Sequence, residues 1–147
     1  MPSFELAKNA FLTGLSLLEQ KKFSEAEEQF KESLIHAPDR PSALINLSIT
    51  LINLDKFSEA KALLFRLTEL EPTNAEAFFY LGLIAKNQSH LDQALSHLTT
   101  ATTLNPHFFD AWLIMADIFD SQHSINDTLK CYDALLQINP QFLGGVD

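Results

Sequence analysis

Apolar residues recur every three or four positions along most of this chain, which is the spacing of one face of an α-helix. Short polar breaks and prolines divide this pattern into pairs of stretches. The predicted helices, pair by pair, are 3–20 with 24–37, 41–54 with 58–71, 74–87 with 92–104, and 108–121 with 126–138. We therefore expect an all-α fold.

Four prolines give the period of the pattern. Pro38, Pro72, Pro106 and Pro140 follow the second helix of each pair and lie 34 residues apart. A fixed period of this length indicates a tandem helical repeat. The repeats are 7–40, 41–74, 75–108 and 109–142, with a tail at 143–147. We expect residues 1–147 to form a single domain.

Two positions in every repeat hold small residues, which let facing helix backbones approach closely. The eighth position holds Gly14, Ser48, Gly82 and Ala116, and the twentieth holds Ala26, Ala60, Ala94 and Thr128. Larger side chains surround them at the fourth and twenty-fourth positions, namely Leu44, Phe78, Trp112, Phe30, Leu64, Leu98 and Tyr132. We expect these larger residues to form the core.

The eighteenth position of each repeat predicts where the second helix begins. It holds Ser24, Ser58, Asp92 and Asn126, all of them residue types favoured as N-caps. In the first repeat, Ser24 and Glu27 have the spacing of a capping box. The neighbouring acidic residues of that turn suit the positive end of the helix dipole.

The set of repeated positions resembles the tetratricopeptide repeat (TPR) family, whose unit is a 34-residue helix-turn-helix. The third repeat matches through Phe78, Leu81, Gly82, Ala94, Leu98, Ala101 and Pro106. The fourth has Thr128 where alanine is usual, and the first has Ala10 in place of the large residue. The resemblance implies a right-handed α-solenoid whose first helices line a concave groove. The two glycines at 144 and 145 disfavour a further helix, so we expect either that the array stops there with a frayed tail or that the chain is part of a longer protein.

Composition excludes several classes of function. The net charge is −9, and residues 75–147 contain only two basic side chains, so nucleic-acid binding is disfavoured. The single cysteine, Cys131, cannot form an internal disulfide, which favours a cytoplasmic location. No secretory signal is present, and no apolar run is long enough to insert into a membrane.

The sequence contains no pattern that predicts catalysis. The five histidines lack the spacing of a zinc site, and Cys131 has no positioned histidine. Glycine-rich phosphate-binding motifs and the nucleophile elbow are absent. We therefore predict a protein that is not an enzyme and that carries no cofactor or metal.

Helical geometry predicts which first-helix side chains point away from the second helix and toward the groove. These positions are strongly apolar, and the first helix of the fourth repeat also carries acidic residues on this side. The candidate binding residues are Phe11, Leu15, Ile45, Asn46, Ile49, Phe79, Tyr80, Leu83, Leu113, Ile114, Asp117 and Asp120. An alternative is that the fifth position of each repeat, and part of the ninth, only packs between neighbouring first helices.

These residues favour a protein-interaction adaptor or scaffold. Its groove would bind an apolar peptide or helix, and the aspartates would favour a basic residue in that ligand. Two alternatives stay open. The chain could be the recruiting arm of a larger enzyme such as a glycosyltransferase, in which arrays with an Asn ladder occur; only Asn46 answers to that ladder. It could also be a self-associating homodimer.

Overall fold

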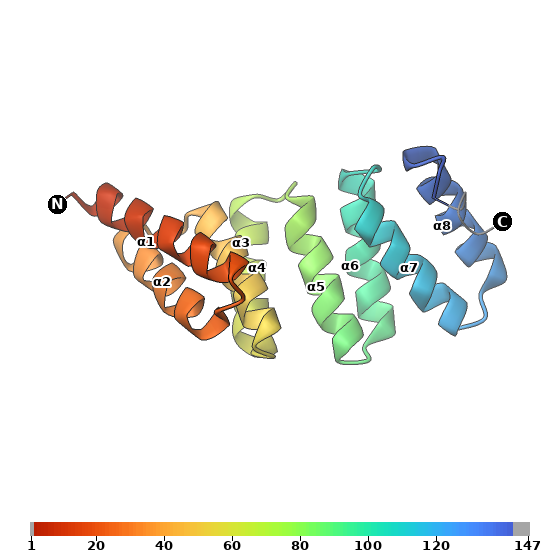
Figure 1. The fold of residues 1–147 in the computed structure, drawn as a ribbon. Coiled ribbons are helices and arrows are strands. Elements are labelled where there is room, and N and C mark those ends of the chain that lie inside the picture. Colours follow the sequence, from red (N-terminus) through yellow and green to blue (C-terminus); the bar gives the residue numbers. More distant parts are fainter. Residues whose placement is uncertain (1, 143–147) are drawn as a thin grey trace. The chain divides into compact units, whose positions relative to one another are not determined.

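The computed structural model describes residues 2–142, and these residues form helices and turns without a β-strand (Figure 1). The helices are α1 (Ser3–Glu19), α2 (Phe23–His36), α3 (Pro41–Asn53), α4 (Phe57–Leu70), α5 (Ala75–Asn87), α6 (Leu91–Leu104), α7 (Phe109–Ser121) and α8 (Ile125–Ile138). Every predicted boundary lies within one residue of the observed one. The four repeated prolines each lie two residues beyond the end of a second helix.

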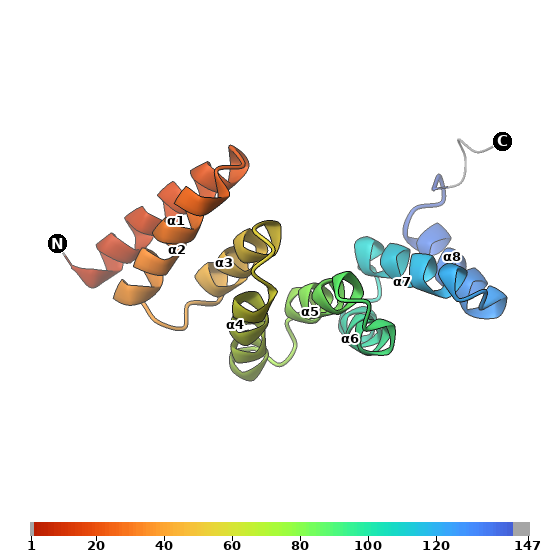
Figure 2. The same ribbon diagram turned by 90° about the horizontal axis from the view of Figure 1, so that it is seen from below.

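The chain forms two compact units, Met1–Tyr80 (unit 1) and Leu81–Asp147 (unit 2), and the division falls within α5. In unit 1, α1 lies along α2, α2 packs on α3, and α3 packs on α4 (Figure 2). In unit 2, α6 packs on α7 and α7 lies along α8. The expectation of one domain over residues 1–147 stays a prediction.

The predicted small residues and four of the seven predicted large ones form the cores of both units, whereas Phe78 and Tyr132 are half-buried. All eight small positions are buried, as are Phe30, Leu44, Leu64 and Leu98. In unit 2, the Cβ atom that Gly82 lacks would lie 2.8 Å from Cγ of Leu98. The glycine therefore permits a close approach of α5 to α6. Trp112 is only half-buried, and its Nε1 donates to the Pro106 carbonyl at 2.9 Å.

Each turn between the two helices of a pair has the same backbone form. Lys21, Asp55, Ser89 and His123 adopt left-handed φ angles of 59°, 59°, 62° and 58°. In the first turn, the Lys22 N–H donates to the Leu17 carbonyl at 2.9 Å and the Lys21 N–H to the Leu18 carbonyl at 2.9 Å. The same two bonds recur in the other three turns and define a Schellman motif.

The predicted N-caps are wrong by two residues, because Lys22, Lys56, His90 and Ser124 occupy the cap positions. The second helices begin at Phe23, Phe57, Leu91 and Ile125, so Ser24 and its equivalents lie inside the first turn. The residues that do precede these helices make no side-chain capping bond. The cause is the tight turn: Lys22 closes α1 with its N–H, and its carbonyl accepts from the Ala26 N–H at 2.9 Å to begin α2.

Candidate functional site

In unit 1, most of the predicted binding residues lie partly exposed on the first helices. Phe11, Leu15, Ile45, Asn46, Ile49 and Tyr80 are half-buried. Phe79 differs, because only 8% of it is exposed and its ring packs edge-on against Tyr80 at 5.0 Å. Its burial fits the alternative in which the fifth position packs between helices. Leu12, beside these residues on α1, is 51% exposed.

Asn46 is a candidate binding residue because a side-chain amide can pair with the backbone of an extended peptide. Its Nδ2 instead donates to the Ser42 carbonyl of its own helix at 2.8 Å. A peptide would therefore have to compete with a bond inside α3 for this donor. This arrangement weakens the case for Asn46 as a recognition residue.

In unit 2, the structure brings four of the five predicted residues together around one pocket, which we call the α7 pocket. Its volume is about 360 Å³. The lining residues are Lys86 from α5, Leu113, Ile114, Ala116, Asp117 and Asp120 from α7, and Tyr132 from α8. Leu83, the fifth predicted residue, is half-buried on α5 and does not line it.

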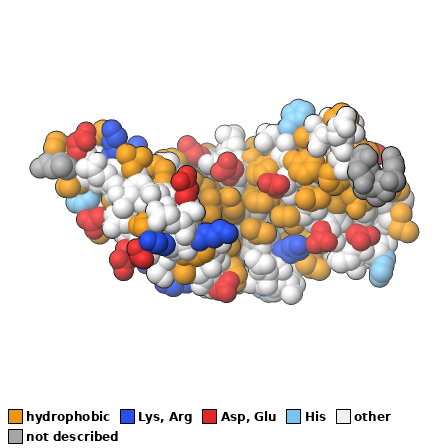
Figure 3. Space-filling model, in the orientation of Figure 1, with side chains coloured by type: hydrophobic (Ala, Val, Ile, Leu, Met, Phe, Trp, Pro, Cys, Tyr) orange, Lys and Arg blue, Asp and Glu red, His pale blue; other side chains and the backbone are white. Residues whose placement is uncertain are grey.

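The α7 pocket combines an apolar wall with charge. Leu113 is 39% exposed, and Figure 3 shows hydrophobic side chains beside acidic ones over α7. The Lys86 Nζ lies 2.8 Å from Oδ2 of Asp117 and joins α5 to α7. Asp120 is exposed, and its carboxylate has no ion pair among residues 2–142. The pocket therefore holds one more negative than positive charge.

Sequence reasoning missed Lys86 and Tyr132 because they lie on other helices of the unit. Lys86 could have been noticed as one of only two basic residues in the second half of the chain. Its contact with Asp117 spans 31 residues, which a pattern along one helix cannot predict.

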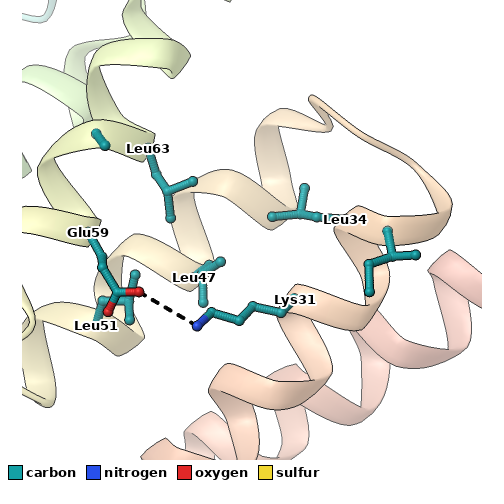
Figure 4. Close-up of a pocket in the computed structure, with 8 residues that line it drawn as sticks. Lys31, Leu34, Leu47, Leu51, Glu59 and Leu63 are labelled. Atoms are coloured by element: carbon teal, nitrogen blue, oxygen red, sulfur yellow. Dashed lines mark ion pairs between the residues drawn. The ribbon is translucent and has the colours of Figure 1, made fainter.

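A second pocket lies in unit 1, away from the predicted binding residues (Figure 4). Its volume is about 440 Å³, and it is lined by Lys31, Leu34, Ile35, Leu47, Leu51, Glu59, Ala62 and Leu63 from α2, α3 and α4. Lys31 and Glu59 form an ion pair at 3.7 Å across it. The residue that could have indicated this pocket in the sequence is Ile35, an apolar residue of α2. In the structure its side chain is 69% exposed.

Beside this second pocket, Glu27 connects two consecutive repeats rather than capping its helix. Its carboxylate accepts from Lys31 Nζ at 2.5 Å and from Lys56 Nζ at 2.8 Å. These two hydrogen bonds hold the pKa of Glu27 below its usual value. Arg66 similarly binds Asp39 with two nitrogens and lowers the pKa of that carboxyl.

The described residues contain no arrangement typical of a metal centre. Within residues 2–142, no group of three His, Cys, Asp or Glu side chains converges as a metal site. Cys131 is 2% exposed, and burial raises the pKa of its thiol to about 11. In the same part of the chain, each helix is too short or too polar to cross a membrane.

Comparison with known proteins finds a similar repeat in part of the chain. A family model described as tetratricopeptide repeat matches residues 17–86. A structure of MamA matches 92% of this chain and 79% of its own, at 17% identity and a TM-score of 0.83. YrrB, a TPR protein with an unusual peptide-binding site, matches 93% of this chain and 71% of its own, at 23% identity and a TM-score of 0.77.

A further MamA structure, residues 41 to the end from Desulfovibrio magneticus RS-1, is similar. It matches 92% of this chain and 77% of its own, at 15% identity and a TM-score of 0.82. No curated protein sequence matches the chain. At these identities the structural likenesses show the fold, and they confirm the predicted class, an all-α solenoid of helix-turn-helix repeats.

Proposed function

We propose that this chain is a non-enzymatic adaptor or scaffold that binds another protein, because a tetratricopeptide repeat model matches residues 17–86 and the described residues fold as paired helices. The binding surface is the face of the first helices that points away from the second helix of each pair. Its ligand is an apolar peptide or helix. Its cytoplasmic location stays a prediction from the single cysteine.

One observation carries this proposal: four residues chosen from helical spacing alone line the same pocket. Leu113 and Ile114 supply apolar surface there, and Leu113 remains 39% exposed. Concave, mostly apolar surfaces with a few polar groups are typical of ligand sites. The peptide-binding site of YrrB, a protein of the same fold, supports peptide binding by this chain.

A selection of short random peptides displayed on phage, made against the whole chain, tests this proposal. We expect enriched peptides to be rich in apolar residues. Their affinity should fall about fivefold in Leu113→Ser, because burying the 39% of this leucine that is exposed contributes about 1 kcal/mol. The measurement is fluorescence anisotropy with a labelled, enriched peptide.

Leu129→Ser is the matched control. Leu129 is 55% exposed on α8 and does not line the α7 pocket. This variant should bind the peptide as the parent chain does, and circular dichroism should show both variants folded. Failure to enrich any peptide, or equal binding by Leu113→Ser, would reject the proposed surface. Phe79→Ser is unsuitable because Phe79 is buried and the change would disturb packing.

Self-association is the second candidate function, and the surface of α8 favours it. Ile125 is 70% exposed and Leu129 is 55% exposed on this helix. A second copy of the chain could bury these side chains in a homodimer. Light scattering across a range of concentrations tests this directly, and a monomer at every concentration would exclude the dimer. The role of a recruiting arm in a larger enzyme stays a prediction.

A further inference from the structure

We propose that the α7 pocket receives an arginine side chain of the bound peptide, whose guanidinium binds the Asp117 carboxylate. In the free chain, Lys86 binds this carboxylate, and the arginine displaces it. This inference rests on the proposed function, because it names the partner residue that the same surface recognises. It adds that Lys86 competes with the peptide for this carboxylate. The affinity for the peptide therefore depends on a residue of α5 as well as on α7.

Charge complementarity favours a cationic occupant. Residues 81–147 contain two basic and seven acidic side chains, and both arginines of the chain lie outside this range. Within the pocket, Asp117 and Asp120 face a single ammonium group, that of Lys86. A partner with one positive charge would therefore neutralise the pocket.

The contact between Lys86 and Asp117 shows that a cation fits at this position. The two groups lie 2.8 Å apart, and their side chains are 33% and 69% exposed. Ion pairs exposed to this degree contribute little to stability, because water screens both charges. The lysine can therefore give up Asp117 to a better ligand without unfolding the unit.

Arginine suits this pocket better than lysine does. Asp117 and Asp120 are three residues apart on α7, so their carboxylates lie on one face of the helix. A planar guanidinium has five N–H donors and can bond to both carboxylates, whereas the Lys86 ammonium bonds to one. The Tyr132 ring in the lining offers a surface on which a guanidinium stacks.

The walls of the pocket match the rest of an arginine side chain. Leu113 and Ala116 lie one helical turn N-terminal to Asp117 and Asp120, and they line the same space. The three methylene groups of arginine can lie along this apolar wall while its head group reaches the carboxylates. Binding thus combines a charged contact with apolar burial.

The first experiment uses an enriched phage peptide together with versions in which its arginine is replaced by citrulline or lysine. Citrulline keeps the shape and removes the charge, so its peptide should bind about tenfold more weakly. The lysine peptide should lose about threefold, because it forms fewer bonds. In the chain, Asp117→Asn with Asp120→Asn should bring the arginine and citrulline peptides to equal affinity.

The matched control for that pair is Asp92→Asn with Asp133→Asn, which changes net charge equally at exposed positions outside the pocket. This control should still prefer arginine. Enriched peptides that lack arginine, or an arginine preference that survives loss of Asp117 and Asp120, would overturn the inference while the proposed function stands. If no peptide is enriched, the proposed function fails and the inference fails with it.

The second experiment tests the internal competitor. Lys86→Gln frees the Asp117 carboxylate, so the arginine peptide should bind about threefold more tightly, and the citrulline peptide should not change. Affinity should also weaken with added salt in the parent chain. An arginine peptide that binds Lys86→Gln and the parent chain equally would overturn the displacement of Lys86.

Discussion

The Cβ atom that Gly14 lacks would lie 2.7 Å from Cε1 of Phe30, closer than two such carbon atoms approach in folded proteins. Phe30 is fully buried, and its ring also packs against Phe11 with centroids 5.9 Å apart. The ring therefore has no free space into which it can retreat. This pair sets how closely α1 and α2 approach each other.

Gly14→Ala should therefore destabilise unit 1, although alanine favours a helix more than glycine does. The gain in helix propensity is about 1 kcal/mol, and the cost of overpacking a filled core is about 1–3 kcal/mol. We expect a net loss of about 1 kcal/mol in the free energy of unfolding, measured by urea denaturation. Increased stability would contradict the close approach of the two helices.

A second substitution shows whether the ring is the cause. In the Gly14→Ala background, Phe30→Leu removes two of the three ring atoms that the new methyl group meets, Cε1 and Cζ. The two changes should therefore be less destabilising together than the sum of their separate effects. Ser16→Ala, at an exposed position of α1, is the control and should change stability by less than about 0.5 kcal/mol. Simple additivity of the two core changes would exclude a direct clash.

Ser24→Ala tests whether Ser24 caps α2, as the sequence predicts, or lies within its first turn, as in the structure. If Ser24 capped α2, the change would cost about 1 kcal/mol. Ser24 instead lies exposed inside the first turn, and α2 has no side-chain cap. We expect a change of less than about 0.5 kcal/mol in the free energy of unfolding. A loss near 1 kcal/mol would restore Ser24 as the cap.

Glu27 should make stability depend on acid pH. Hydrogen bonds from Lys31 and Lys56 lower its pKa in the folded chain below the ordinary value of 4.5. The resulting stabilisation is present above that pH and is lost as pH falls through the lowered folded pKa. Urea denaturation should therefore show Glu27→Gln losing stability relative to the parent chain at neutral pH, and losing less at about pH 3.

Glu28→Gln is the charge-matched control for this measurement. Glu28 follows Glu27 on α2 but is exposed, and it forms no ion pair among the described residues. A pH profile of Glu27→Gln that runs parallel to that of the parent chain would show that the two lysines do not stabilise the folded state through this carboxylate.

Cys131 should resist thiol reagents while the chain is folded. Its side chain is buried, and the raised pKa of about 11 keeps the thiol protonated near neutral pH. Thiolates are the reactive form, so labelling with a disulfide reagent at pH 8 should be slow and should become rapid in urea. Rapid labelling of the native chain would show that α8 opens readily.

Periodicity along one helix predicts much of this structure, and contacts between helices account for what it missed. The apolar spacing correctly predicted the helices and the buried small positions. The caps were missed because the left-handed turn residues are not glycines, so the turn was not recognised. The role of Glu27 depends on Lys56, which is 29 residues away and becomes a neighbour only when repeats stack.

In the candidate site, too, helical spacing predicted which residues share a face but not how neighbouring helices cover that face. Leu113, Ile114, Asp117 and Asp120 share one face of α7, and helical spacing alone places them together. Phe79 was expected on the binding surface, yet it is buried, because spacing cannot say how much of a face the neighbouring helix covers. Which side of a repeat meets solvent depends on packing between repeats.

Substitution of a left-handed turn residue by glycine should raise the thermal stability of this protein. Side chains with a Cβ atom pay a steric cost of about 1–2 kcal/mol in this conformation, whereas glycine pays almost none. Aspartate and histidine tolerate it better than lysine, so Lys21 is the most unfavourable residue at this position of the repeat. Lys21→Gly is therefore the first substitution to make for a thermostable version of the chain. Residue 21 is far from the α7 pocket in sequence, and the change leaves the residues that line the pocket as they are.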